Sequence, residues 1–202
     1  MIDGHTGNTR APRRGRPRTE GLDERVLAAT REVVTRDGYG AATIDEIARV
    51  AGVSKGSIYR RWPTKGVLVY QACVLNDDAL AALVDSGDVA DDLVEIAMMT
   101  ARGQRSGAQH DVLRQVFADA ARDPQLATLL RERFFAPRSE AIAERARRAI
   151  GRGELRADLD PALVPAIING AQQYWRTVWD RPMTDAEVRA LVGVIVGSQE
   201  RR

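Results

Sequence analysis

Apolar residues recur at three- and four-residue intervals along most of this chain, which is the spacing of an amphipathic helix. The first such segment begins near Leu22, and Gly38 is its natural end because glycine readily adopts the left-handed conformation that terminates helices. No segment alternates apolar and polar residues convincingly, as a half-buried strand would. The pattern therefore predicts an all-α chain. The buried face of the first helix should carry Val26, Leu27, Thr30, Val33 and Val34.

Two short helices joined by a tight turn are predicted next. Thr43 and Glu46 have the spacing of a capping box, so a helix should begin there and reach about Val50. The turn Ala51-Gly52-Val53 follows, and Ser54 should cap a second helix from Lys55 to about Trp62. Ala48 is small enough for the two helices to cross, and Gly52 allows a positive φ in the turn. This is the plan of a helix-turn-helix unit.

The second helix has one apolar face and one polar, positive face. Val53 and Ile58 are its inward anchors. A purely structural helical hairpin would share that apolar spacing, but it would have no reason to gather cations and hydroxyls on one exposed turn and a half. We therefore favour a DNA-binding surface. Its expected members are Ser54, Lys55, Ser57, Tyr59, Arg60 and Arg61.

Helical spacing continues to the end of the chain. A helix is predicted from Thr64 to Val84, and it would join the basic unit to the rest of the chain as a lever. Pro137 and Pro165 should kink or split the helices that contain them, because proline lacks the amide donor. The remaining helices are expected at about 89–105, 109–121, 124–150, 161–180 and 184–200.

Composition and charge restrict the classes of protein. A single cysteine, Cys73, excludes an internal disulfide framework and favours a reducing compartment. The polar N-terminus is no secretory signal, and apolar runs such as 192–196 are too short to span a bilayer, so we expect a cytoplasmic protein with no membrane partner. Residues 1–70 carry 13 Lys and Arg against 8 Asp and Glu, whereas residues 71–202 carry 17 against 20. This asymmetry indicates that the N-terminal third meets a polyanion.

Residues 39–68, YGAATIDEIARVAGVSKGSIYRRWPTKGVL, closely resemble the signature of the TetR family of transcriptional regulators. The resemblance covers about the first third of the chain. Matched position by position, it implies that Thr43 and Lys65 contact phosphates and that the recognition helix presents Ser54, Lys55, Gly56, Ser57, Tyr59 and Arg60. Gly66 departs from the acidic residue that the family often has there, and Trp62 stands where the family often has Phe.

The resemblance also implies an architecture and a function. Residues 1–20, rich in Gly, Pro, Thr and Arg, are expected to be a disordered basic arm. The resemblance implies a three-helix DNA-binding domain over 21–68 and a helical effector-binding and dimerisation domain over 69–202. The implied function is sequence-specific binding of double-stranded DNA at a palindromic operator by a homodimer. The usual outcome is repression, relieved when a small molecule binds.

The N-terminal arm contains Arg13-Arg14-Gly15-Arg16-Pro17-Arg18, which resembles the core of an AT-hook. In that motif an extended segment lies in a narrow minor groove, where Arg14 and Arg16 would meet the negative potential of A·T tracts. The alternative is a basic tail that only adds non-specific attraction to phosphates.

The C-terminal part is less informative. In the family the last two helices of each subunit form a four-helix dimer interface. The alternative is that the apolar residues of these helices pack within one subunit. The residues expected at the interface are Leu163, Ile167, Gly170, Ala171, Val188, Leu191, Val192 and Ile195. Effector contacts are expected among the middle helices, although such side chains more often belong to a core. Gln172 and Gln173 offer polar contacts there. His110 is a further candidate, but the favoured interpretation is a surface or satisfied helix-end histidine. The candidate lining is Met98, Met99, Phe117, Phe134, Tyr174 and Trp175.

The sequence argues against catalysis and metal binding. One cysteine and two histidines, of which His5 lies in the arm, do not supply a zinc site. No metalloprotease, P-loop or nucleophile-elbow motif occurs, so we expect no enzyme and no cofactor. Two rivals remain. An architectural DNA-binding protein would share the basic unit but would not need the large helical domain, and a structural scaffold would not bind DNA.

Overall fold

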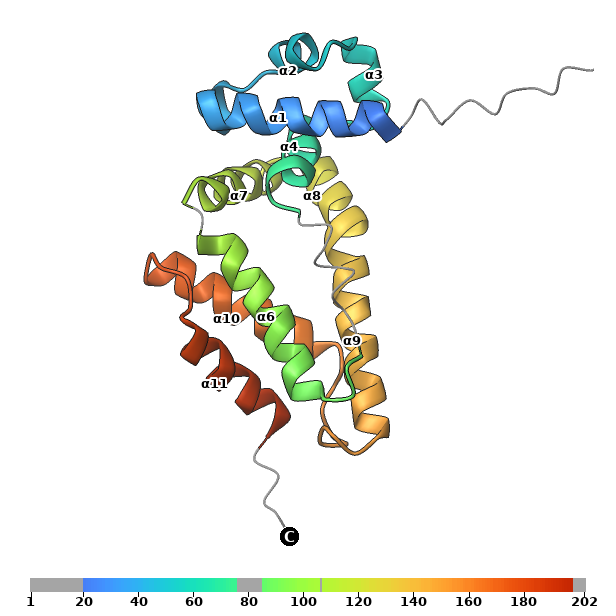
Figure 1. The fold of residues 1–202 in the computed structure, drawn as a ribbon, viewed down its shortest axis with the longest axis vertical. Helices are drawn as coiled ribbons and strands as arrows, with labels where there is room; N and C mark the ends of the chain where they lie inside the picture. The colour runs from blue at the N-terminus through green and yellow to red at the C-terminus, as the bar shows by residue number, and fades with distance from the viewer. Residues whose placement is uncertain (1–19, 76–84, 106, 198–202) are drawn as a thin grey trace, which may run out of the picture.

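The computed structural model describes residues 20–75, 85–105 and 107–197, and every regular element within these ranges is a helix (Figure 1). The expectation of an all-α chain is confirmed for them. In chain order the elements are α1 (Glu20–Ala41), α2 (Ile44–Ala51), α3 (Lys55–Tyr59), α4 (Lys65–Cys73), α6 (Val89–Arg105), α7 (Gly107–Ala120), α8 (Pro124–Leu130), the π-helical turn η1 (Arg131–Phe135), α9 (Ala136–Gly151), α10 (Leu163–Val178) and α11 (Asp185–Val196).

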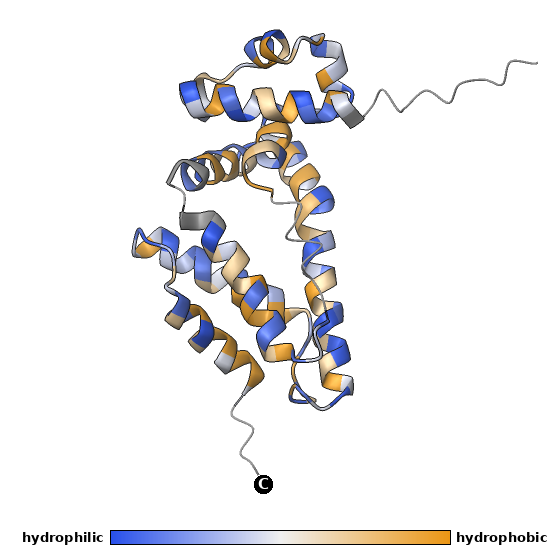
Figure 2. Cartoon of the chain, viewed as in Figure 1, coloured by the Kyte–Doolittle hydropathy of each residue, from blue (hydrophilic) through white to orange (hydrophobic). Residues whose placement is uncertain are grey.

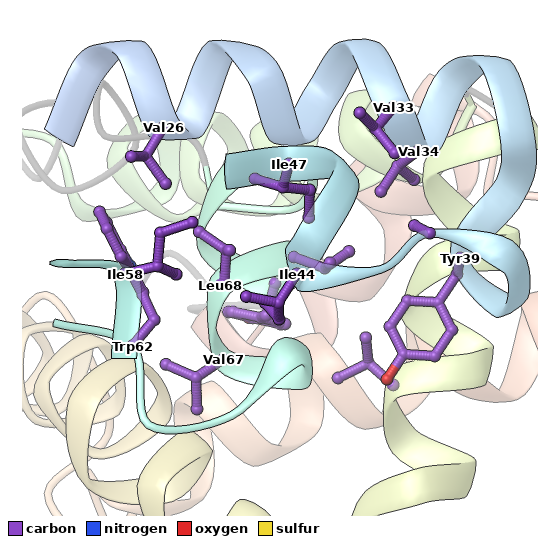
Figure 3. Close-up of a cluster of buried hydrophobic side chains, with 14 of the residues drawn as sticks. Val26, Val33, Val34, Tyr39, Ile44, Ile47, Ile58, Trp62, Val67 and Leu68 are labelled. Carbon is purple, nitrogen blue, oxygen red and sulfur yellow. The ribbon is translucent and has the colours of Figure 1, made fainter. Parts of the chain in front are cut away.

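The first four helices enclose a hydrophobic cluster at one end of the molecule (Figure 3). Val26, Ile47, Ile58 and Leu68, one from each helix, are completely buried in it. The same cluster includes residues of α7, α8 and η1, so the core of the N-terminal unit extends across the expected domain boundary at residue 68. The N-terminal unit therefore packs directly on the helices that follow it.

A second hydrophobic cluster lies among α6, α9, α10 and α11. Leu93, Ala146, Ile168 and Val188 are completely buried in it. Apolar and polar residues are interspersed along these helices (Figure 2). The C-terminal half thus has a core of its own.

Three sequence-based expectations about helix ends and prolines can be compared with the structure. The helix expected over 64–84 ends at Cys73, because the Leu75 amide donates back to the Tyr70 carbonyl at 3.0 Å; residues 76–84 lie outside the described residues. The helix expected over 124–150 is split before Pro137, as predicted. Ala136 donates to the Arg131 carbonyl, five residues back, and this forms the π-helical turn. Pro165 kinks nothing, because α10 begins at Leu163 and a proline in the first turn has no helical donor to lose.

None of the helices described in the structure is long and apolar enough to cross a membrane.

Candidate nucleic-acid interface

The helix-turn-helix unit is held by side-chain caps and a glycine turn. The Thr43 hydroxyl accepts from the Glu46 amide at 3.2 Å, and α2 ends at Gly52 in the left-handed conformation with φ 63°. Nothing within the chain obstructs a side chain at Gly52, so its positive φ alone explains the glycine. The Ser54 hydroxyl then accepts from the Ser57 amide at 3.2 Å and begins α3. These predicted caps and the turn are confirmed.

Only half of the predicted capping box forms. Instead of returning to the Thr43 amide, the Glu46 carboxylate accepts from Arg49 at 2.8 Å and from Arg36 at 2.9 Å. These hydrogen bonds, the Arg49 one foremost, lower the pKa of Glu46 to about 2. Because Arg36 belongs to α1, the bonds connect α1 to α2.

The outer face of α3 carries the predicted recognition residues. Ile58 is completely buried, whereas Tyr59 is 49% exposed and Gly56 is open to solvent. A Cβ at Gly56 would meet only the Ser54 hydroxyl, at 4.0 Å, so no contact within the chain requires this glycine. The predicted residues that are exposed are Ser54, Lys55, Gly56, Tyr59 and Arg60, together with Thr43 on the preceding helix cap; Ser57 is half-buried.

Two cations of this surface are held by acidic residues of neighbouring helices. Lys55 forms an ion pair with Asp45, which is 64% exposed on α2. Arg61 forms an ion pair with Asp23 of α1, and its side chain is only 24% exposed. The placement of Arg61 on the fully exposed face is therefore wrong, because its guanidinium joins the end of α3 to α1.

Lys65 is the half-buried first residue of α4 and lies against the end of α1. Its Nζ donates to the Tyr39 carbonyl at 2.9 Å and to the Ala42 carbonyl at 3.2 Å, and it sits 4.4 Å from the centroid of the Tyr39 ring. The ammonium group thus satisfies carbonyls at the end of α1, where a cation is favourable. This structural role was not anticipated from the sequence.

Gly66 is explained by packing. A Cβ at this position would lie 2.7 Å from the Leu126 Cδ2 atom of α8. Helix α4 nevertheless begins normally, because the Thr64 hydroxyl accepts from the Val67 amide at 3.2 Å. The departure from the family pattern at Gly66 therefore leaves the helix start intact and brings α4 close to α8.

Other contacts join the N-terminal unit to the helices after it. The Tyr39 hydroxyl donates to Asp119 of α7 at 2.5 Å, and Arg133 of η1 donates to the Arg61 carbonyl at 2.9 Å. Burial and the hydrogen bond to Asp119 raise the pKa of Tyr39 well above its usual range, so the phenol stays protonated and donates. Arg14 and Arg16 of the predicted arm lie outside the described residues.

The predicted effector-contact residues do not come together. Phe134 belongs to the first hydrophobic cluster and Met98 to the second, while Met99 is half-buried. Phe117 is 36% exposed and packs on Phe135, with 5.8 Å between ring centroids. Tyr174 is 53% exposed, and the half-buried Trp175 donates from Nε1 to Glu187 at 3.2 Å.

The predicted dimer face is partly wrong. Val188, Val192 and Ile195 are at most 3% exposed because they pack inside the subunit against α6. Leu163 and Gly170 are exposed, and Ile167, Ala171 and Leu191 are half-buried. Tyr174 and Val178, which share the apolar spacing of Leu163 along α10, are also exposed. Trp179 and Val194 are exposed apolar residues that were not expected on this face from the sequence.

A shallow apolar groove of about 250 Å³ lies between α10 and α11 on this face. Trp175, Leu191 and Val194 are among its lining residues, and Val194 is 79% exposed.

Among the described residues no group of His, Cys, Asp and Glu side chains has the arrangement of a metal site.

Comparison with known proteins agrees with this architecture. Residues 26–72 match the family model described as bacterial regulatory proteins, tetR family, and residues 83–195 match that of the tetracyclin repressor-like C-terminal domain. The chain is 31% identical to the uncharacterized HTH-type transcriptional regulator YdeS of Bacillus subtilis, over 89% of this chain and 90% of that protein. It is 29% identical to the DNA-binding transcriptional repressor TetR of Mycobacteroides abscessus, over 83% and 87% of the two chains.

Solved structures show the same arrangement of helices. The crystal structure of the TetR family transcription regulator SCO0332 superposes with a TM-score of 0.73 at 31% identity, covering 88% of this chain and 97% of that one. The structure of Salmonella enterica GusR superposes with a TM-score of 0.62 at 22% identity, covering 87% and 95%.

Proposed function

This chain belongs to the TetR family and is a helix-turn-helix transcriptional regulator, and from that premise we propose how it works. We propose that a homodimer inserts the two copies of α3 into successive major grooves of a palindromic operator and represses the adjacent gene. A small molecule held by the C-terminal helices then releases the DNA. The arrangement of α3 carries this proposal: it is capped at Ser54, anchored by Ile58 and open to solvent at Tyr59.

The proposed contacts divide into two kinds. Lys55, Ser57, Tyr59 and Arg60 would face base edges, where a good contact discriminates by about 1–3 kcal/mol. Thr43 and Ser54 would lie against phosphates, and Gly56 would allow the DNA backbone to approach α3 closely. Lys65 and Arg61 would act mainly through the packing that orients α3, since both already bind groups within the chain.

The proposed dimer uses the exposed apolar face of α10 and α11. Leu163, Tyr174, Val178, Trp179 and Val194 are each at least half exposed, which is costly for side chains of this size unless a partner covers them. In a two-fold dimer this patch would face its own copy. The recognition helices would then be held about 34–36 Å apart, one turn of DNA, or at a related spacing.

Release requires that the ligand alter how the two N-terminal units are held. The bond from Tyr39 to Asp119, the bond from Arg133 to Arg61 and the contact of Gly66 with Leu126 would transmit such a change. To weaken operator binding tenfold, the ligand must favour the non-binding arrangement by about 1.4 kcal/mol.

The test is footprinting of the purified full-length protein on DNA that flanks its own gene. A protected site with two-fold symmetry is expected. Protection without sequence preference would instead support an architectural DNA-binding protein, and no retention on DNA would support a scaffold.

Deleting residues 1–19, which removes five arginines, should weaken binding more on A·T-rich than on G·C-rich flanks if Arg14 and Arg16 enter the minor groove.

A further inference from the structure

Among the described residues, five hold a buried polar side-chain atom with no hydrogen-bond partner. Ion pairs account for two of them, because Asp23 contacts Arg61 and Arg145 contacts Asp92. The atoms that remain are His110 Nδ1, Gln172 Oε1 and Arg176 Nε. A buried polar group without a partner destabilises the folded state, so each such atom in a native protein requires an explanation.

The three side chains lie at one junction of helices. Gln172 and Arg176 are one turn apart on α10 and therefore share a face. Gln172 is completely buried and its Nε2 donates to the Ala97 carbonyl of α6 at 3.1 Å, which places it where α10 crosses α6 (Figure 1). His110 is on the first turns of α7, the helix that follows α6.

Electrostatics connect His110 to the same junction. Burial lowers the pKa of His110, and the nearby positive charge of Arg176 lowers it further, followed by that of Arg114; Asp111 and Asp180 act in the opposite direction. Arg176 also donates from Nη1 to the Asp180 carbonyl at 3.0 Å, and this bond holds the guanidinium at the end of α10. The group is therefore fixed in place while its Nε–H remains free.

We propose that His110, Gln172 and Arg176 form the polar end of the effector site, and that the effector is a small organic carboxylate with an apolar body. This inference rests on the proposed function and adds the chemical class of the ligand. The Arg176 Nε–H would donate to a carboxylate oxygen, a charge-assisted and therefore strong hydrogen bond. Gln172 Oε1 would accept from a hydroxyl or N–H of the ligand, and His110 would complete the site through Nδ1.

The surroundings fit an apolar ligand body. Ala97, whose carbonyl accepts from Gln172, and Ala101, one turn further along α6, are buried in the second hydrophobic cluster. The half-buried Trp175 of α10 packs on the same cluster. A ligand with an aromatic ring would extend the cluster while its carboxylate reached Arg176. Benzoate, salicylate and phenylacetate, each with its uncharged primary amide, are therefore suitable probes.

The experiment measures binding of these probes by the tryptophan fluorescence of the full-length protein, and the thermal midpoint without a probe. The variants are Gln172→Met, which removes the unpaired acceptor at nearly constant shape, and Arg176→Lys, which keeps the charge but removes Nε. Gln173→Met is the matched control. The sequence suggested Gln173 as an effector contact too, but its Nε2 donates to the Thr177 hydroxyl at 3.0 Å on the same helix, and it has no buried unpartnered atom.

At least one carboxylate should bind the wild type and Gln173→Met, and bind Gln172→Met and Arg176→Lys at least tenfold more weakly. Its amide should not bind. Gln172→Met removes the unpaired acceptor and also the donor to the Ala97 carbonyl, so its stability can change in either direction. Binding is therefore measured below the thermal midpoint of each variant, and loss of carboxylate binding by the folded Gln172→Met protein is the result that supports the site.

Two results would overturn the assignment. Either no carboxylate binds the wild type, as expected if a buried water alone satisfies the three atoms, or the carboxylates bind all four proteins equally. Operator binding without a probe is measured in parallel. If the operator is bound and uncharged compounds release it, only the carboxylate site is wrong; if the operator is never bound, the proposed function itself fails.

Discussion

The Tyr39 hydroxyl donates a hydrogen bond of 2.5 Å to the Asp119 carboxylate, across 80 residues of sequence and between the N-terminal unit and α7. Tyr39 lies in the last turn of α1, and Lys65 lies over its ring. The orientation of the helix-turn-helix unit on the C-terminal helices thus depends on a polar contact as well as on apolar packing.

Replacing Tyr39 by Phe keeps the ring beneath Lys65 and removes only the hydroxyl. We expect a loss of about 1–3 kcal/mol in the free energy of unfolding, because the partly buried Asp119 carboxylate loses its partner. Amide exchange should also become faster in α1–α3 than in α9. Asp119→Asn tests the same bond by changing the acceptor. An unchanged free energy of unfolding in both variants would contradict the proposed contribution of this hydrogen bond to stability.

Alanine substitutions at two glycines should have opposite effects. At Gly66 the added methyl would lie 2.7 Å from Leu126, and such overpacking costs typically about 1–3 kcal/mol. At Gly56 the space is open, so alanine should stabilise α3 by up to about 1 kcal/mol. Urea unfolding of the two variants measures both effects.

Gly56→Ala should nevertheless weaken operator binding, because its methyl would stand between α3 and the DNA backbone. Binding at wild-type affinity by a stabilised Gly56→Ala protein would mean that no close approach occurs there. The Gly66→Ala/Leu126→Val double variant should recover part of the stability that Gly66→Ala loses.

Lys55 forms an ion pair with Asp45, so substitutions of both residues test whether the Lys55 ammonium group binds DNA. Lys55→Ala should weaken operator binding by about 1–3 kcal/mol with the fold unchanged. Asp45→Asn should strengthen binding to random DNA at low salt, because it frees Lys55 and removes a negative charge near phosphates. Asp158→Asn, a charge change at a residue 78% exposed far along the chain, is the control in gel-shift titrations.

Val194→Asp should produce a folded monomer. The side chain is 79% exposed in the subunit, so the carboxylate remains hydrated until a partner covers it. Val188→Asp should instead prevent folding, because Val188 is completely buried. Sedimentation and circular dichroism separate the two outcomes, and a dimeric Val194→Asp protein would place the interface elsewhere.

Stability of the N-terminal unit should fall in acid partly through Glu46. Its pKa is lowered from the usual 4.5 to about 2, so its contribution is present above pH 4.5 and is lost as the pH falls towards 2. Glu46→Gln should therefore flatten the decline of unfolding free energy between pH 5 and pH 2.5, whereas Glu95→Gln on α6 should leave it unchanged. Equal slopes for the two variants would contradict the prediction.

The sequence alone determined the local features of this protein. The caps at Thr43, Ser54 and Thr64 and the turn at Gly52 depend on residues within three or four positions of one another, so spacing was sufficient to predict them. The inward placement of Val26 and Ile58 followed from helical periodicity for the same reason.

Tertiary structure decided every feature that depends on which faces meet. An apolar stripe on α11 is compatible with a dimer interface and with the core of one subunit, so the sequence could not distinguish them. The structure packs Val188, Val192 and Ile195 against α6 in the core and leaves Val194 exposed. Gly66 and Lys65 were interpreted from the family resemblance alone. In the structure Gly66 packs on Leu126, sixty residues away, and Lys65 binds the Tyr39 carbonyl. Helical periodicity identifies an apolar face, but not the surface that covers it, because that surface is contributed by residues distant in sequence.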